Sequence, residues 1–190
     1  MIVPIEVSAR HIHLTKNDIE ILFGKNYLLK IVRKISQPGQ FAAQETVDVI
    51  SSKKRINNVR ILGPAREKTQ LEISLSDAYE LGLKVPVRQS GDLAKSAGKV
   101  TIIGPKGKIN LVEGVIIAAR HLHIEPALAK KYNIKDKQIV AIEISGTRAL
   151  IFNRVLVRSR KGLDKLSFQI DVDEANAAGV TSGCKGKLII

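Results

Sequence analysis

The sequence predicts a mainly β protein with short helices, made of two similar small domains related by a pseudo-twofold repeat. Two observations predict this class. The segment 8–14 recurs 110 positions later as 118–124. Each copy is then followed by the same succession of a short helical pattern and alternating apolar runs. Two copies at so long a period are too few for a solenoid.

We place the first half at 1–112, with the first repeat copy and a connector, and the second half at 113–190. In the first half, Thr15 and Asp18 form the start of a short helix, and Gly24 suits its C′ position. In the second half, Pro126 suits a first helical turn and Asn133 can end it.

Strands follow these helices in both halves. Each half closes with a strand that runs into another helix, and in this register Glu72 corresponds to Gln169. The predicted strands are 47–50, 59–62, 139–144 and 150–157, and the closing strand–helix segments are 71–78 and 168–175.

The segment between the halves is rich in glycine and proline. We interpret 86–93 as loop and 105–107 as the turn of a hairpin. The runs 100–103 and 112–119 are too apolar to stay exposed, so we expect the connector to contribute strands rather than act as a flexible linker.

The composition indicates which kinds of partner to expect. The 190 residues include 31 Lys and Arg against 18 Asp and Glu, a net charge of +13 that attracts anions. Aromatic residues are only 4% and tryptophan is absent, so a nucleic-acid partner, which uses stacking platforms, is disfavoured. No apolar run approaches the roughly 20 residues of a membrane span. Because no signal-peptide pattern opens the chain, we expect a cytoplasmic protein.

All four histidines lie in the two repeat copies, as the pairs His11/His13 and His121/His123. In an extended strand, residues i and i+2 face the same side, so both imidazoles of a pair can bind one ion. Two pairs predict either two metals or one four-histidine site. The alternative is that these are surface or hydrogen-bonded histidines.

A third ligand is expected from the strand that closes each half. Glu72 is the natural choice for the first pair, although it could be a solvent-facing strand residue. Gln169 holds the equivalent place in the second half, and a neutral amide is a poorer zinc ligand. The repeat therefore predicts unequal sites.

Three arginines stand near these elements. Arg66 follows a strand six residues before Glu72, and its planar guanidinium suits a phosphoryl group. Arg10 and Arg120, just before the histidine pairs, point to the opposite strand face and can equally stabilise the fold by pairing with carboxylates such as Asp77 or Glu174.

Seven ordered motifs are similar to those of the PduL-type phosphate propanoyltransferases. They are 7–14, 36–43, 60–66, 69–74, 86–93, 118–123 and 173–178. This resemblance implies two interlocked β-barrels that exchange strands. It also implies acyl transfer between coenzyme A and phosphate at zinc, with acyl-CoA and phosphate as substrates and a homo-oligomeric assembly.

By the same resemblance, His11, His13 and Glu72 are the first zinc ligands, and Arg66 is the catalytic residue that grips phosphate. His121 and His123 are implied as ligands of a second zinc. Gln169 stands where the family has a third histidine. A non-catalytic or impaired relative that binds coenzyme A or zinc is therefore the alternative function.

The resemblance also implies contacts with coenzyme A from Ser8, Arg60 and Asn176. No extension precedes the first motif, so we expect no microcompartment-targeting helix.

Overall fold

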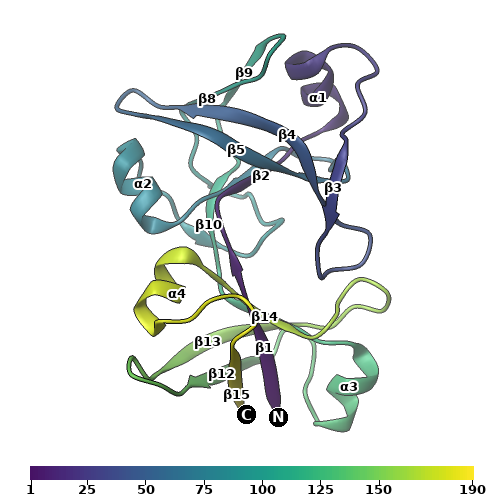
Figure 1. Ribbon diagram of the computed structural model, residues 1–190, viewed down its shortest axis with the longest axis vertical. Coiled ribbons are helices and arrows are strands. Elements are labelled where there is room, and N and C mark those ends of the chain that lie inside the picture. Colours follow the sequence, from purple (N-terminus) through teal and green to yellow (C-terminus); the bar gives the residue numbers. More distant parts are fainter. The chain divides into compact units, whose positions relative to one another are not determined.

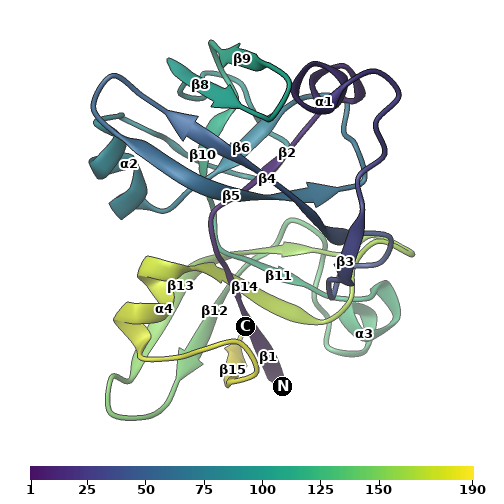
Figure 2. The same cartoon turned by 45° about the horizontal axis from the view of Figure 1, so that its top comes forward.

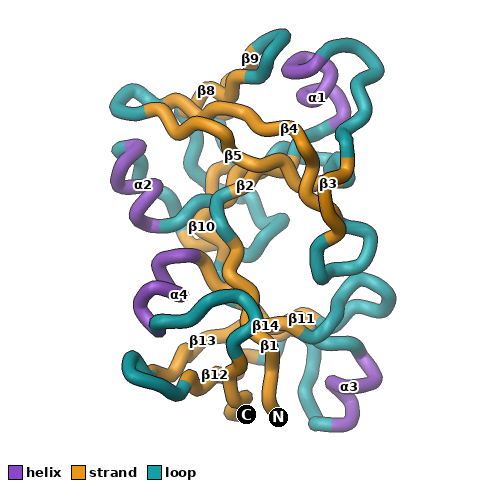
Figure 3. Tube along the Cα trace, viewed as in Figure 1, coloured by secondary structure: helices purple, strands orange, loops and turns teal.

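The computed structural model describes all 190 residues and divides the chain into two compact units. Unit 1 comprises 1–9, 36–38 and 119–190, and unit 2 comprises 10–35 and 39–118. Strands account for 42% of the chain and four short helices for 15%. Figure 3 draws the strands in orange and the helices in purple. The predicted mainly β class is therefore confirmed.

Unit 1 is a closed six-stranded barrel accompanied by two helices (Figure 1). Around the barrel the strands are β1 (Ile2–Ser8), β14 (Ser167–Asp171), β11 (His121–His123), β13 (Leu150–Arg158), β12 (Ile139–Ile144) and β15 (Lys185–Ile189). Its helices are α3 (Pro126–Lys131) and α4 (Val172–Ala178).

Unit 2 is a curled sheet that also has two helices (Figure 2). In order the strands are β7 (Val87–Arg88), β10 (Val115–Ala118), β6 (Gln70–Glu72), β2 (His11–His13), β5 (Arg55–Gly63), β4 (Phe41–Ile50), β8 (Val100–Ile103) and β9 (Lys108–Leu111), with β3 (Ile31–Lys34) paired to β4. Its helices are α1 (Lys16–Phe23) and α2 (Leu75–Leu81).

The two units have the same order of hydrogen-bonded strands, which we call the strand circuit. The order β10-β6-β2-β5-β4-β8 in unit 2 corresponds to β1-β14-β11-β13-β12-β15 in unit 1. Parallel and antiparallel pairings agree along the whole series. An antiparallel bridge between Ala97 and Val115 joins the ends of the unit 2 series, where unit 1 has the full pairing of β1 with β15. The sequence repeat is thus a repeat of strand order.

The strand before each histidine pair belongs to the other unit. β1 runs on toward β2 but is part of unit 1, and β10 runs on toward β11 but is part of unit 2. Each unit is therefore built from discontinuous stretches of chain. The division of the sequence at residue 112 stays a prediction.

Local signals determine where the helices begin and end. Ser74 and Asp77 form a capping box at α2, and Asp171 and Glu174 form one at α4. Both helices end at a left-handed glycine, at Gly82 and Gly179. At α1, the Thr15 side chain accepts a hydrogen bond from the Asp18 amide. The start and end that the sequence predicts for α1 are confirmed, and α2 and α4 begin within the predicted segments 71–78 and 168–175.

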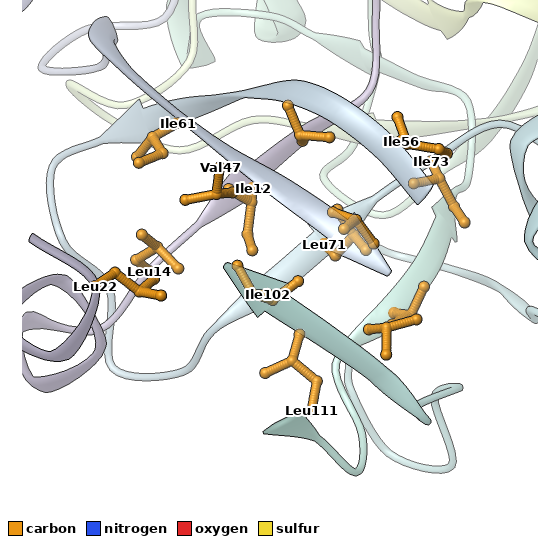
Figure 4. Close-up of a cluster of buried hydrophobic side chains, with 14 of the residues drawn as sticks. Ile12, Leu14, Leu22, Val47, Ile56, Ile61, Leu71, Ile73, Ile102 and Leu111 are labelled. Carbon is orange, nitrogen blue, oxygen red and sulfur yellow. The ribbon is translucent and has the colours of Figure 1, made fainter. Parts of the chain in front are cut away.

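Each unit has its own hydrophobic core. In unit 2 it includes Ile12, Ile61 and Leu71, all fully buried (Figure 4). In unit 1 it includes Leu122 and Phe168, also fully buried. The middle residue of each histidine pair, Ile12 or Leu122, points into the core, so the flanking imidazoles lie on the opposite strand face.

The connector contributes strands, as predicted. Its hairpin turns at 104–107, where the Gly104 amide donates to the Gly107 carbonyl at 2.9 Å. In the apolar run 112–119, residues 114–117 are buried and Ala118 and Ala119 are half-buried, while Val112 is largely exposed in the turn before β10. None of the four helices is long and apolar enough to cross a membrane.

Candidate active site

The first histidine pair gathers a buried carboxylate. β2 places His11 and His13 on one face, and the antiparallel pairing of β2 with β6 sets His11 opposite Glu72. The Glu72 Oε1 atom lies 3.7 Å from His11 Nε2 and 3.9 Å from His13 Nε2. Ligand atoms around a tetrahedral zinc lie ~3.3–3.5 Å apart. The three side chains are buried, and they form a group whose spacing suits one metal ion.

The hydrogen bonds of this group leave acceptors facing one another. His13 Nδ1 lies 3.1 Å from the Leu62 carbonyl, which can only accept, so the proton is on Nδ1 and Nε2 carries a lone pair. Glu72 Oε1 accepts from Gln70 Nε2 at 2.5 Å and from Ser90 Oγ at 2.8 Å. Acceptors that converge in a buried place are the donor set that zinc prefers.

Burial and charge favour the ligand forms of both residues. The pKa of His13 falls to about 3 because of burial first, and then because of His11 and the positive charge of Arg66. Burial by itself raises the pKa of Glu72, but the histidines and the Ser90 hydroxyl outweigh it, so that pKa is lowered. Neutral imidazole and ionised carboxylate are the forms that bind metal.

Arg66 lies beside this group. Its loop follows β5 after a cis Gly63–Pro64 bond, and the Arg66 amide donates to the Leu14 carbonyl at 2.9 Å, just past β2. The guanidinium is close enough to lower the pKa of His13. The structure therefore places the backbone of Arg66 next to the end of β2, and the charge of its guanidinium acts on His13.

The second histidine pair has the same position in unit 1. β11 sets His121 opposite Gln169, as β2 sets His11 opposite Glu72. His121 Nδ1 lies 2.9 Å from the Ala119 carbonyl, and His123 Nδ1 lies 2.6 Å from Asp164 Oδ1. The two Nε2 atoms face each other at 3.0 Å.

Asp164 is the outer partner of this pair. Its buried carboxylate also accepts from the Arg160 backbone amide and guanidinium. Burial raises the pKa of Asp164, yet Arg160 and His123 lower it to about 2. Burial also lowers the pKa of His123 against the opposing effect of Asp164. An ionised aspartate thus orients a neutral imidazole, an arrangement common behind metal-ligating histidines.

Gln169 turns its amide nitrogen away from the histidines. Gln169 Nε2 donates to Glu6 Oε2 at 3.0 Å, and Glu6 lies opposite Gln169 across the pairing of β1 with β14. Ser36 Oγ donates to the same oxygen at 2.6 Å. The repeat correctly predicts the equivalence of Glu72 and Gln169, but the partner Glu6 has no counterpart in unit 2, where Ile116 lies opposite Glu72.

The arginines before each pair stabilise the capping boxes. Arg10 pairs with Asp77 at 2.9 Å, and Arg120 pairs with Glu174 at 2.6 Å. The structural interpretation of these two arginines is therefore confirmed.

The residues implied for coenzyme A lie in both units. Ser8 ends β1 opposite Asp171, and Asn176 is exposed on α4. Arg60 donates to the carbonyls of Ala43 and Gln44 on β4. The role of these three residues stays a prediction.

Sequence reasoning missed the residues that hydrogen-bond the candidate ligands. These are Ser90 and Gln70 beside Glu72, Asp164 beside His123, and Glu6 beside Gln169. It also missed Gln37, whose buried amide bonds Ser167 Oγ at 2.9 Å and the backbone of Lys165. Gln37 belongs to the motif 36–43, whose proline and glycine by themselves predict only a turn. The one available signal was the place of Gln70 two residues before Glu72 on the same strand face.

The fold and the site together define a protein with two matching β circuits, one of which carries a candidate metal centre beside an arginine. The chain matches the family model of phosphate propanoyltransferase over residues 4–181. The phosphate propanoyltransferase of Thermotoga maritima is 51% identical over 178 residues, 93% of this chain and 84% of that protein. Those of Alkaliphilus metalliredigens and Listeria monocytogenes are 48% and 43% identical, over 100% and 98% of this chain and 88% and 87% of their own lengths.

The chain therefore belongs to the phosphate propanoyltransferase family, a family of acyltransferases. This confirms the resemblance stated from the seven motifs.

Proposed function

We propose that this chain reversibly transfers a short acyl group, propanoyl or acetyl, between coenzyme A and inorganic phosphate at a zinc site. The observation that carries the proposal is the buried His11, His13 and Glu72 group with Arg66 beside it, in a member of this family. The names of the relatives support phosphate and a propanoyl donor as the substrates.

Arg66 holds the phosphate. A guanidinium offers two parallel N–H donors that match two phosphate oxygens. The position of Arg66 next to His13 would bring the anion to the candidate metal group. The net charge of +13 attracts phosphate and the phosphates of coenzyme A toward the protein.

His11, His13 and Glu72 would hold the zinc, with Gln70 and Ser90 fixing the carboxylate. Zinc bound there supplies Lewis-acid chemistry, which lowers the free-energy cost of negative charge on substrate oxygen and sulfur atoms. His121 and His123 would hold a second zinc.

The reaction exchanges one acyl bond for another. A phosphate oxygen attacks the thioester carbonyl carbon, the C–O bond forms, the C–S bond breaks, and the sulfur leaves as the thiolate of coenzyme A. Holding both substrates in line supplies up to ~7–11 kcal/mol. No acyl-enzyme is required, so Cys184 takes no part. Ser8, Arg60 and Asn176 would contact coenzyme A.

The test is release of free thiol from propanoyl-CoA or acetyl-CoA. We expect release to depend on phosphate, to stop after metal chelation and to return with zinc. Arg66→Gln should raise the KM for phosphate strongly, whereas the control Arg55→Gln, an exposed arginine paired with Asp48 on β4, should not. Equal rates without phosphate, or unchanged rates in metal-free protein, contradict the proposal.

The alternative is an impaired relative that binds coenzyme A or a single zinc without transfer. The presence of Gln169 where the resemblance implies a third histidine favours it, because a neutral amide is a poorer zinc ligand than imidazole. Two results together would establish this alternative. The wild type would bind coenzyme A but release no thiol in response to phosphate, and Gln169→His would restore that release. A homo-oligomeric assembly and a cytoplasmic location stay predictions.

A further inference from the structure

The second histidine pair carries an electrostatic conflict that a cation would resolve. The partner of His121 Nδ1 is the Ala119 carbonyl, and the partner of His123 Nδ1 is the Asp164 carboxylate, whose two oxygens already accept from Arg160. Both Nδ1 atoms are therefore donors, and in the neutral imidazoles that bind metal each Nε2 atom then carries a lone pair. Two such acceptors face each other at 3.0 Å in a buried place. A metal between them satisfies both, and the spacing is close to the ~3.3 Å of two tetrahedral ligands.

Gln169 is next to this pair in a row of three strands. The pairings set Glu6 on β1 opposite Gln169 on β14, and Gln169 opposite His121 on β11. Side chains opposite one another lie on the same face of a sheet. The amide of Gln169 is thus placed between a carboxylate and the histidines.

Glu6 decides which end of the amide faces the histidines. Its carboxylate accepts from Gln169 Nε2 at 3.0 Å, and Ser36 Oγ holds the same oxygen at 2.6 Å. Because a carboxylate attracts only the N–H end, the amide oxygen is directed away from Glu6. In the row of strands, away from Glu6 is toward His121.

We propose that the amide oxygen of Gln169 is the third protein ligand of a metal held by His121 and His123, and that Glu6 is the positioning residue that turns this amide. The ligand set of unit 1 is then neutral, whereas that of unit 2 includes the Glu72 carboxylate. A neutral ligand set attracts a divalent cation less strongly than a set that includes a carboxylate. We therefore expect the site in unit 1 to bind zinc with lower affinity than the site in unit 2. That the bound metal is zinc is taken from the proposed function, and the proposal rests on it in that respect.

The test is zinc binding to the metal-free full chain, measured by competition with a chromophoric chelator and by elemental analysis. We expect two zinc ions per chain of unequal affinity, with His123→Ala removing the weaker one. Gln169→Ala should weaken that site about 10–100-fold, and Gln169→His should strengthen it. The stronger site reports on unit 2 alone, so circular dichroism and thermal unfolding of each variant check that unit 1, which carries the substitutions, is folded.

Glu6→Gln separates a positioning role from direct ligation. The new amide oxygen still accepts from Gln169 and Ser36, so we expect the weaker site to stay within about 3-fold of the wild type, while Glu6→Ala weakens it more. Glu143→Gln, on β12 of the same barrel, is the matched control and should change neither site.

Three results would overturn the proposal: one zinc per chain, wild-type affinity in Gln169→Ala, or a loss in Glu6→Gln as large as in Gln169→Ala. The last would identify Glu6 itself as the ligand. Measuring thiol release from propanoyl-CoA distinguishes a failure of this inference from a failure of the proposed function. An active wild type with one zinc contradicts only the inference, and an inactive wild type with two contradicts only the function.

Discussion

Unit 2 and unit 1 share a strand circuit but differ in where the carboxylate stands. In unit 2, Glu72 is directly opposite His11. In unit 1, the amide of Gln169 is opposite His121, and the carboxylate of Glu6 is one strand further away. The backbone pairings agree, so the fold tolerates either arrangement. The charge that a metal would meet depends on one row of side chains.

The largest expected difference concerns the ligands themselves. We expect His13→Ala to lower kcat/KM for phosphate-dependent thiol release by on the order of 10³-fold, because it removes a ligand beside Arg66. His123→Ala should cost less, about 10–100-fold, since its site already has a neutral third residue. Steady-state kinetics with propanoyl-CoA measure both losses. Equal losses would show that the two units contribute alike.

The residue between the histidines tests whether the two cores are equivalent. Ile12→Ala and Leu122→Ala each leave a cavity in a fully buried core, and we expect each to lower the free energy of unfolding by about 2–5 kcal/mol. Urea unfolding of metal-free protein measures the change. A loss confined to one variant would show that one core packs more loosely than the burial of its residues indicates.

The residues that orient the ligands should have intermediate effects. Ser90→Ala removes a donor to Glu72, and Asp164→Asn removes the carboxylate behind His123. We expect each to lower zinc affinity about 10-fold or more at its own site only. Chelator competition measures this. Loss at both sites from either single change would mean that the sites are coupled.

The smallest effect is expected from the arginines before each pair. Arg10→Met and Arg120→Met break ion pairs with capping carboxylates, and both arginine side chains are at least one-third exposed. Solvent screening limits each loss to about 1 kcal/mol or less. Thermal unfolding is the measurement, and a much larger loss in one variant would reveal a role beyond capping.

Much of this arrangement could be predicted from sequence because it depends on local spacing. Alternation in a strand places the two histidines of a pair on one face, and capping boxes define where α2 and α4 begin. The repeat also aligned Glu72 with Gln169. These signals lie within a few residues or between two recognisable copies.

The orienting residues could not be predicted, because they come from distant loops and neighbouring strands. Ser90 lies in a connector, Asp164 follows β13, and Glu6 faces Gln169 only through the register of β1 with β14. That register is decided by packing of the whole barrel and not by any pattern near Glu6.

The discontinuous composition of unit 1 has a consequence for its synthesis. β1 is synthesised before the rest of unit 1, and its two neighbours, β14 and β15, are more than 150 residues later in the chain. Until β14 is synthesised, β1 has neither of the strands that pair with it, while unit 2 can assemble around β2. Closing the barrel of unit 1 is a late event whose rate depends on that long separation.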